Sequence, residues 1–479
     1  MSERAHSSAP LMVSVSGCRG ITGESLTPDV VARFAGAFAG WVREEQGGGG
    51  AGRPVIVAGR DGRRGGEAVQ QQAMEALRDA GCDVIDLGVA TTPTVGVMVL
   101  HYRADGGLVV TASHNPAEWN GLKPISRAGG AAAPSDAARI AERFRENRVA
   151  ARAGTRGTVR EEGSAAEVHA ARVVEAIARL TDVSAIRGKR FRVALDSVNA
   201  SGRIAGRMLL ERLGCAVTHL NGDSSGVFPH PPEPVKEHLG ELCTVAAREG
   251  AAAGFAQDPD ADRLAIVDEQ GRYIGEEYTL VLAAWSMLAM LPGERARGAV
   301  LCANLSTSRM IDDVAAKFGA RVVRTPVGEA NVVAGMRREG AVIGGEGNGG
   351  VIWPEVVPIR DSLGAMALVL ALMARTGKRL RELVADVPAY SIEKRKIELS
   401  GGSGMVERAL GAVKAMFARD ELNTSDGVRA DFTTPSGKGR AWVHVRASNT
   451  EPIMRLIAEA PTAEDARQVL ERVQKEIGK

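Results

Sequence analysis

The sequence predicts an α/β protein of several domains, and two observations carry that prediction. Apolar, β-branched runs alternate with longer stretches of helical periodicity, which is typical of βα units with a buried parallel sheet. The chain has 479 residues, which is too long for one core, and at roughly 150 residues per domain it is expected to form about three or four domains. We therefore expect three similar mixed α/β domains followed by a smaller α+β domain.

The alternation occurs three times along the chain. The predicted strands are 53–61, 82–88 and 107–116 in the first unit, 191–201, 215–223 and 251–262 in the second, and 298–306, 320–328 and 340–348 in the third. Intervening helices are predicted at 65–81 and 308–319. The basic, alanine-rich stretch 147–163 indicates a domain boundary near residue 160.

The C-terminal part has a different pattern. A helix at 405–420, strands at 427–434, 439–448 and 453–460, and a last helix from about Ala463 predict a small α+β domain. The expected domains are 1–160, 161–273, 274–388 and 389–479.

Composition is that of an ordinary soluble protein, with 44% apolar residues, 25% charged residues and a net charge of +2. It predicts neither a nucleic-acid partner nor a membrane partner. The first residues lack the apolar run of a signal peptide, so we expect a cytoplasmic protein. The most apolar segments, 279–291 and 362–374, are shorter than the roughly 20 residues of a membrane span and are predicted to be core helices. Five scattered cysteines without CxxC spacing are predicted to be reduced thiols.

The first polar motif is TASHNP, in which an apolar strand runs into Ser113, His114 and Asn115 before Pro116 closes the turn. Ligands of open α/β sheets bind beyond the carboxyl ends of strands, so a hydroxyl here is well placed for chemistry. Taken alone, the motif also fits an ordinary turn with a capping histidine.

The second motif, DPDADR, sets Asp258, Asp260 and Asp262 at alternate positions. It resembles half of a calcium loop, but Arg263 occupies the position that requires glycine and the flanks are predicted strands rather than helices. Three carboxylates so close together repel one another unless a hard cation neutralises them, and we expect Mg²⁺. A solvated acidic loop is the alternative.

The third motif, GGEGNGG, contains a literal GxGxxG, but the following residues include a proline and have no helical period, which excludes a dinucleotide site. Glu346 and Asn348 on a glycine-rich loop suit the hydroxyl pairs of a sugar, although a turn without function fits equally well.

The fourth motif, RASNTEP, places four polar residues between a strand and a proline: Arg446, Ser448, Asn449 and Thr450. A guanidinium group, hydroxyls, an amide and turn N–H groups form a cradle for a phosphate dianion. An ordinary turn stabilised by an Asx bond is the alternative.

Together the four motifs resemble those of the α-D-phosphohexomutases, in the order of that family and one in each predicted domain, and the resemblance covers essentially the whole chain. It implies a heart-shaped enzyme of four domains around a central cleft. The implied reaction interconverts a hexose 6-phosphate and a hexose 1-phosphate through a phosphoserine and a hexose 1,6-bisphosphate, with one Mg²⁺ per chain.

The resemblance also assigns roles to residues. Ser113 would carry the phosphate and, with Asp258, Asp260 and Asp262, hold Mg²⁺. The residues implied around the transfer site are Arg19, His114, Lys123 and Arg263, with Lys123 or His114 moving the proton. Glu346 and Asn348 would bind the sugar, and the four residues of the fourth motif would bind the phosphate that is not reacting.

Two positions bear on which sugar is used. Asn348 stands where phosphomannomutase/phosphoglucomutases of the family tend to carry serine, and Glu329 stands where they tend to carry histidine. A further carboxylate favours an ammonium group, so we expect glucosamine 6-phosphate to be converted to glucosamine 1-phosphate. We expect the enzyme to be a monomer or homodimer. The alternatives are a phosphomannomutase/phosphoglucomutase, a metal-dependent sugar phosphatase and a sugar-phosphate binding protein without activity. The family usually has serine at Gly65, a departure expected to affect packing more than chemistry.

Overall fold

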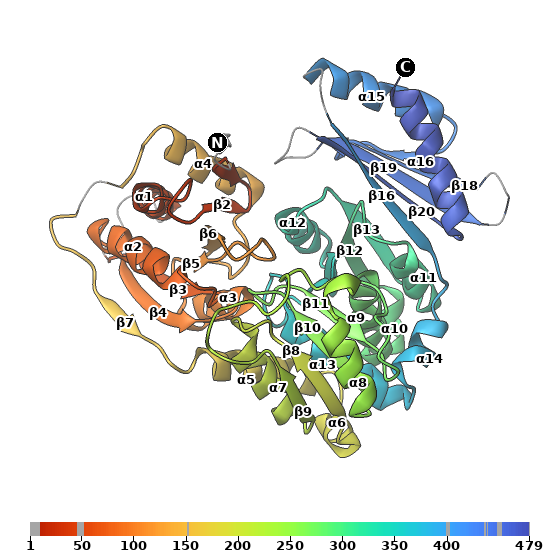
Figure 1. Cartoon of the computed structure of the whole chain (residues 1–479), viewed down its shortest axis with the longest axis horizontal. Helices are drawn as coiled ribbons and strands as arrows, with labels where there is room; N and C mark the ends of the chain where they lie inside the picture. The colour runs from red at the N-terminus through yellow and green to blue at the C-terminus, as the bar shows by residue number, and fades with distance from the viewer. Residues whose placement is uncertain are drawn as a thin grey trace, which may run out of the picture.

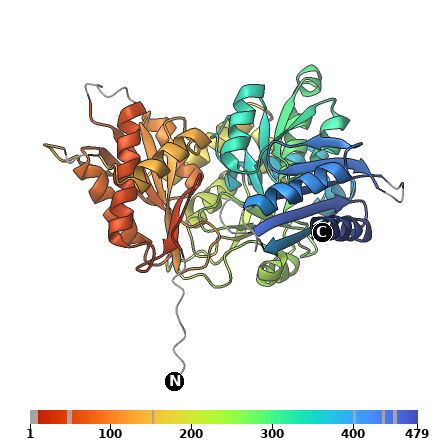
Figure 2. The same ribbon diagram turned by 90° about the horizontal axis from the view of Figure 1, so that it is seen from above.

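The computed structural model describes residues 10–45, 52–150, 153–398, 403–434, 437, 439–447 and 453–478. In these residues the strands form four sheets, of seven, four, four and five strands in chain order. Figure 1 shows each sheet with its own helices. In the view of Figure 2 the first domain lies at one end of the molecule, and the third and fourth domains lie at the other.

The first domain contains a seven-stranded mixed sheet in the order β1-β2-β6-β5-β3-β4-β7. Its elements are β1 (Met12–Ser14), β2 (Gly17–Ile21), α1 (Pro28–Glu45), β3 (Val55–Arg60), α2 (Gly66–Asp79), β4 (Asp83–Val89), α3 (Thr92–Tyr102), β5 (Gly106–Val110), β6 (Trp119–Ser126), α4 (Pro134–Arg145) and β7 (Val159–Glu161).

The second and third domains each contain a four-stranded sheet. The elements of the second are α5 (Ala165–Ala178), α6 (Val183–Lys189), β8 (Arg192–Asp196), α7 (Gly202–Arg212), β9 (Ala216–Leu220), the 3₁₀ turn Lys236–His238, α8 (Gly240–Arg248), β10 (Ala253–Gln257) and β11 (Leu264–Val267). Those of the third are α9 (Glu277–Met290), α10 (Gly293–Arg297), β12 (Val300–Asn304), α11 (Met310–Lys317), β13 (Arg321–Thr325), α12 (Glu329–Glu339), β14 (Ile343–Glu346), β15 (Gly350–Ile352), α13 (Ser362–Thr376) and α14 (Leu380–Ala385).

One four-stranded unit recurs in these three domains. Its order is β6-β5-β3-β4 in the first, β11-β10-β8-β9 in the second and β15-β14-β12-β13 in the third, and the first strand of each set of four is antiparallel to the second. The hairpin that joins these two antiparallel strands contains the first motif in the first domain, the second motif in the second and the third motif in the third. Three of the four motifs therefore occupy the same place, at the carboxyl edge of a sheet.

The fourth domain is a five-stranded antiparallel sheet in the order β16-β20-β19-β18-β17. Its elements are β16 (Ser391–Glu398), α15 (Ser403–Met416), β17 (Glu421–Asn423), β18 (Val428–Thr433), β19 (Arg440–Ala447), β20 (Ile453–Ala460) and α16 (Ala463–Ile477). The prediction of three strands was wrong, because β16 and β17 were missed. In β16, Ile392 and Ile397 point to opposite faces among charged residues, so no apolar period of two is visible. β17 has only three residues.

The apolar core is continuous through the first three domains and separate in the fourth. One buried cluster includes residues of α3, β8, α9 and α13, whereas the cluster between the fourth sheet and its helices α15 and α16 contains residues of that domain alone. Figure 1 shows both of these helices on one face of the sheet, which leaves the other face toward the third domain. Hydrogen bonds of Arg429, His444 and Glu459 join the fourth domain to the third.

The apolar segments expected in the core are α9 and α13, and both helices are buried along most of their length. This confirms the prediction. Among the described residues, no helix is both long enough and apolar enough to cross a membrane. The five cysteines are free thiols, as expected.

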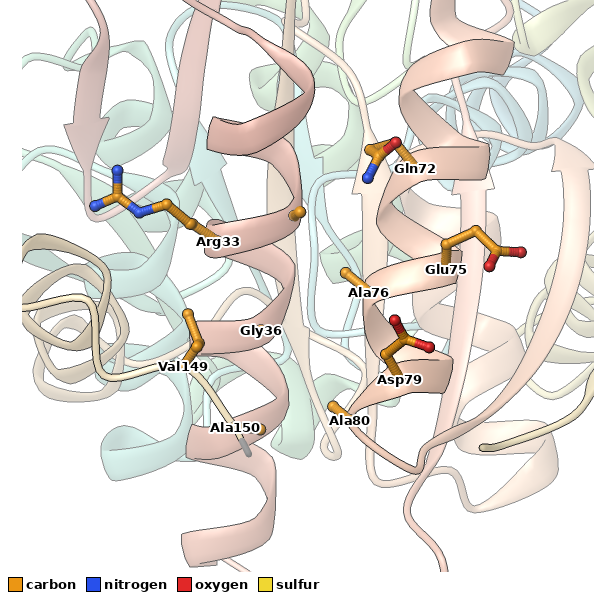
Figure 3. Close-up of a pocket in the computed structure, with 10 residues that line it drawn as sticks. Arg33, Gly36, Gln72, Glu75, Ala76, Asp79, Ala80, Val149 and Ala150 are labelled. Carbon is orange, nitrogen blue, oxygen red and sulfur yellow. The ribbon is translucent and has the colours of Figure 1, made fainter. Parts of the chain in front are cut away.

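A hollow of about 270 Å³ lies between α1 and α2, on the outer part of the first domain. Figure 3 shows the small residues Gly36, Ala76 and Ala80 between the two helices, with Val149 and Ala150 crossing α1. None of the residues predicted to form the functional site lines this hollow.

Candidate active site

The hairpins of the first and second domains bring Ser113 to the three aspartates. Ser113 Oγ donates a hydrogen bond to Asp258 Oδ2 at 2.9 Å. One carboxylate oxygen from each of Asp258, Asp260 and Asp262 lies within 4.8 Å of the others. All four side chains are buried. The serine of the first motif and the carboxylates of the second therefore form one cluster.

The loop that carries Ser113 is held in a strained conformation. Ser113 has φ +49°, in the left-handed region that non-glycine residues seldom occupy. Its N–H donates to Thr111 Oγ1 at 2.8 Å, and Thr111 Oγ1 donates to Asp61 Oδ2 at 2.6 Å. Arg63 pairs with Asp61 at 2.8 Å and donates to the carbonyl oxygens of Ser113 and Trp119 at 2.5 and 2.6 Å. A buried ion pair thus fixes the backbone that presents the hydroxyl group.

The aspartate cluster has the properties of a site for a hard cation. Asp260 Oδ1 and Asp262 Oδ1 are buried, and neither has a hydrogen-bond partner in the described part of the chain. Burial, together with the charges of Asp260 and Asp262, raises the pKa of Asp258 well above its ordinary value. Buried carboxylates with unused oxygens are the ligands that Mg²⁺ prefers. The residues fit the predicted magnesium ion.

Three of the predicted cationic side chains lie around this cluster. Lys123 Nζ is 3.2 Å from Asp262 Oδ2 and 3.9 Å from Glu329 Oε2. Burial opposes the charge on Lys123, but the neighbouring carboxylates outweigh burial and raise its pKa. Arg263 Nε is 3.9 Å from Asp262 Oδ1, and Arg19 donates to Asn115 Oδ1 at 3.1 Å. The arrangement surrounds a negatively charged site with fixed positive charges.

His114 lies beside the serine. Its Nδ1 is 3.4 Å from Ser113 Oγ, and its Nε2 is 3.8 Å from Glu233 Oε1. Burial and then the charges of Arg263 and Arg19 hold the pKa of His114 well below its ordinary value. The imidazole ring is therefore neutral at pH 7 in the unphosphorylated chain.

Arg360 joins three carboxylates from two domains and was not predicted. Its guanidinium group donates to Glu329 Oε2 at 2.8 Å, to Glu346 Oε2 at 2.8 Å and to Asp262 Oδ2 at 2.5 Å. Burial opposes ionisation of Asp262, but Arg360, Lys123 and Arg263 outweigh burial and lower its pKa. Arg360 therefore links the hairpin of the second domain to that of the third.

The hairpin of the third domain presents Glu346 and Asn348 to the same region. Glu346 Oε1 accepts hydrogen bonds from Asn304 Nδ2 at 2.8 Å and from the Gly328 N–H at 3.1 Å. Asn348 Oδ1 accepts from the Gly350 N–H at 3.3 Å. A Cβ atom on Gly347 would lie 2.1 Å from the carboxylate of Glu277, so this position of the loop requires glycine.

The fourth domain contributes Arg446, at the end of β19. Its Nε donates to Asp426 Oδ2 at 2.9 Å, and the side chain is mostly buried. The other predicted phosphate ligands, Ser448, Asn449 and Thr450, lie outside the described residues.

A cleft of about 380 Å³ lies next to the buried cluster of Ser113 and the aspartates, which do not themselves line it. The predicted site residues that line it are Arg19, Lys123, Arg263, Glu329, Glu346, Asn348 and Arg446. They come from all four domains, so the chain forms four domains around a central cleft.

The residues missed at this site are Asp61, Arg63 and Arg360. Asp61 and Arg63 directly follow an apolar strand in GRDGRRGG, and Arg360 stands before the N-cap of an apolar helix. A charged residue at the carboxyl edge of a sheet was the signal available in the first case. The sequence holds no signal for the three carboxylates that surround Arg360, because they come from distant segments.

Comparison with known proteins agrees with this geometry. Sequence models of the phosphoglucomutase/phosphomannomutase family match the chain four times: alpha/beta/alpha domain I at 11–151, domain II at 171–271, domain III at 275–390 and the C-terminal domain at 406–476.

Curated relatives match over nearly the full length. A phosphoglucomutase/phosphomannomutase from Thermococcus kodakarensis is 36% identical over 460 residues, which are 95% of this chain and 96% of that protein. A protein named probable phosphoglucosamine mutase, from Methanopyrus kandleri, is 33% identical over 455 residues, or 95% of each chain.

Solved structures show the same fold. A phosphoglucomutase/phosphomannomutase family protein from Burkholderia thailandensis has a TM-score of 0.80 at 25% identity, covering 97% of this chain and 98% of that one. The N-acetylphosphoglucosamine mutase of Aspergillus fumigatus, solved with GlcNAc-6P and magnesium, has a TM-score of 0.52 at 17% identity, covering 81% of this chain and 92% of that one. The chain therefore belongs to the phosphoglucomutase/phosphomannomutase family, whose members are phosphohexomutases.

Proposed function

We propose that this phosphohexomutase interconverts glucosamine 6-phosphate and glucosamine 1-phosphate through a phosphate carried on Ser113. The observation that supports the route is the 2.9 Å hydrogen bond between the buried Ser113 Oγ and Asp258, beside a cleft that Arg19, Lys123 and Arg263 line. A serine hydroxyl is a poor nucleophile, but a phosphoserine only has to give up its phosphoryl group. The chain supplies position and charge for that transfer.

In the first transfer, the bond between phosphorus and Ser113 Oγ breaks and a bond forms from phosphorus to a sugar hydroxyl oxygen. Asp258, Asp260 and Asp262 would hold Mg²⁺, which, when bound, neutralises charge that develops on the transferred group. Arg19 and Arg263 place further positive charge at the same cleft. The second transfer returns the other phosphoryl group of the bisphosphorylated sugar to Ser113.

Two residues are assigned to the proton of the sugar hydroxyl. His114 Nδ1 lies 3.4 Å from Ser113 Oγ, the oxygen that must gain a proton when the phosphoryl group leaves it. Lys123 is held in its charged form by the carboxylates around it and lines the cleft where the sugar would lie. We propose that Lys123 and His114 move the proton between the sugar hydroxyl and Ser113 Oγ.

The far end of the substrate would be bound by the third and fourth domains. Glu346 and Asn348 line the cleft next to Arg446, where sugar hydroxyls and the phosphate that is not reacting would lie. Ser448, Asn449 and Thr450 belong to the same proposal, as ligands of that phosphate. Arg446 is held by Asp426, which fixes the plane of its guanidinium group for a phosphate.

The proposed preference for an amino sugar is supported by Glu329. Its Oε1 is buried without a hydrogen-bond partner in the described part of the chain, and the residue lines the cleft. An ammonium group would complete this acceptor better than a hydroxyl group. Arg360 and Lys123 already offset charge at Oε2, so the preference should be modest.

The alternative sugar is supported by the relatives. The protein from Thermococcus kodakarensis, at 36% identity, is named phosphoglucomutase/phosphomannomutase. A neutral hydroxyl group can also donate to Glu329 Oε1, so glucose or mannose phosphate is the second candidate.

A comparison of kcat/KM for glucosamine, glucose and mannose phosphates, each with a trace of the matching 1,6-bisphosphate, decides between these substrates. We expect glucosamine phosphate to be preferred by about tenfold, since one charge-assisted hydrogen bond is worth roughly 1.5 kcal/mol. Preference for a glucose or mannose phosphate would overturn the sugar but not the mechanism. Release of inorganic phosphate alone would indicate a phosphatase.

We propose that the enzyme is a monomer or homodimer. Its place in the cytoplasm is a prediction from the sequence.

A further inference from the structure

Asp426 lies in the turn before β18 and connects the fourth domain to the third. Its Oδ2 accepts hydrogen bonds from Arg446 Nε at 2.9 Å and from the Val327 N–H at 3.0 Å. Its carbonyl oxygen lies 2.7 Å from His444 Nε2, and His444 Nδ1 lies 2.9 Å from Ser306 Oγ in the third domain. Asp426 therefore holds both Arg446 and the loop of the third domain that contains Val327.

The loop that Asp426 contacts leads into the two glutamates that are proposed to bind the sugar, Glu329 and Glu346. Val327 precedes Gly328, whose N–H donates to Glu346 Oε1 at 3.1 Å. Glu329 follows and pairs with Arg360. Both Val327 and Arg446 line the cleft. The Asp426 carboxylate thus touches the proposed phosphate ligand on one side and the sugar-binding region on the other.

Two other contacts between these two domains lack this property. Arg429 donates to the Leu305 carbonyl oxygen at 2.6 Å, and Glu459 accepts from the Arg309 N–H at 2.9 Å. Neither Arg429 nor Glu459 lines the cleft described above. They join the domains without touching a group that would bind substrate.

We propose that Asp426 is a positioning residue that couples capture of the non-reacting phosphate to the placement of residues 327–329 and Glu346. The inference rests on the proposed role of Arg446. An anion bound to Arg446 fixes the guanidinium group, and the guanidinium group fixes the carboxylate that receives the Val327 N–H. The Asp426 contact with Val327 also joins the fourth domain, which has its own apolar core, to the third.

The test separates the phosphate from the sugar. Enzyme phosphorylated on Ser113 is given glucose, which has no phosphate, and the transfer rate is measured with and without saturating phosphite. The ratio of the two rates is the activation by the anion. In Asp426→Asn the side chain can still accept from Val327, but it no longer carries the charge that pairs with Arg446. We expect the activation to fall at least about fivefold, the lower end of typical coupling between two sites.

Asp431→Asn is the matched control. Asp431 is in β18 of the same domain, its side chain is 21% exposed against 19% for Asp426, and it too pairs with one arginine, Arg429 at 2.8 Å. Asp431 has no hydrogen bond to residues 327–329 among those described. We expect its phosphite activation to stay within about twofold of the wild-type value. Equal losses in both variants, or no loss in Asp426→Asn, would overturn the proposal.

Hydrogen exchange gives a second readout that does not depend on turnover. Phosphite should slow exchange of the Val327 amide in the wild-type enzyme and in Asp431→Asn, and should leave it unchanged in Asp426→Asn. If Asp426→Asn does not fold, the wild-type result decides: an amide that phosphite does not protect would contradict the coupling. Failure of the proposed function looks different, because the wild-type enzyme would then transfer no phosphoryl group to any hexose phosphate.

Discussion

At the scale of single residues, Asp258 has two opposing requirements. It must ionise to hold a cation, yet burial and two neighbouring carboxylates raise its pKa. Without metal, the folded chain binds a proton at Asp258 more tightly than the unfolded chain, whose aspartates have a pKa near 3.9. The free energy of unfolding of the metal-free enzyme should therefore fall as pH rises from about 4 through the raised pKa.

Replacing Asp258 by asparagine removes this conflict. In EDTA at about pH 8, Asp258→Asn should raise the free energy of unfolding by about 1–2 kcal/mol, because a buried like-charge repulsion is lost. Urea unfolding measures the effect, and isothermal calorimetry should show that Mg²⁺ binding is lost.

The pH dependence supplies the control. Stability of the metal-free wild-type enzyme should converge with that of Asp258→Asn as the pH is lowered and Asp258 becomes protonated. An asparagine variant that is less stable than wild type in EDTA, or that binds Mg²⁺ normally, would refute the role of Asp258.

At the scale of elements, one hairpin position repeated in three sheets provides the chemistry. The hairpins β5–β6, β10–β11 and β14–β15 carry the serine, the aspartates and the sugar-binding loop. Each hairpin is fixed by a buried arginine or a glycine rather than by its own hydrogen bonds alone. Arg63 fixes the first, and Arg360 joins the other two.

Arg63→Lys tests how firmly the first hairpin must be held. Lysine keeps the charge but loses the fork that reaches the Ser113 and Trp119 carbonyl oxygens. We expect the free energy of unfolding to fall by about 2–4 kcal/mol and phosphoryl transfer to slow by about 10- to 100-fold. Urea unfolding and pre-steady-state transfer from the phosphorylated enzyme measure the two effects.

Arg64→Lys is the control for this substitution, because Arg64 is the next residue in the chain and is exposed. It should change stability by no more than about 0.5 kcal/mol. If both substitutions have the same effect, Arg63 does not fix the loop.

Much of the fold could be predicted from the sequence because its signals are local. Strands that end in TASHNP and DPDADR alternate with helices, and apolar runs identified α9 and α13 as core helices. The strand β16 could not be predicted, because Ile392 and Ile397 fall on opposite faces. Its pairing with β20 depends on a distant segment.

In the candidate site, too, residues in local motifs could be predicted and residues that depend on distant contacts could not. The motifs located Ser113, the aspartates and Glu346, because each motif is contiguous. Arg360 was missed, since its three partners are 14, 31 and 98 residues away. The pairing of Glu329 with Arg360 was not predicted either. It partly neutralises the Glu329 carboxylate, which is expected from the sequence to favour an amino sugar.

At the scale of the whole molecule, the cleft is complete only when all four domains are in place. Three domains share one apolar core, and the fourth packs its own sheet against α15 and α16. The first two domains hold the serine and the aspartates, and the fourth domain brings Arg446 to the cleft. Such a division suits a bisphosphorylated sugar that must turn around between two transfers.

The central claim is that Ser113 carries the phosphoryl group between the two transfers. The direct measurement is to incubate the enzyme with Mg²⁺ and ³²P-labelled hexose 1,6-bisphosphate, digest it and locate the label. We predict about one phosphate per chain on the peptide that contains Ser113, and this label should transfer to added hexose monophosphate. Ser113→Ala should carry no label. Ser126→Ala, which replaces a serine at the far end of β6, is the matched control and should be labelled normally. Label on another residue, or turnover by Ser113→Ala at the wild-type rate, would contradict the claim.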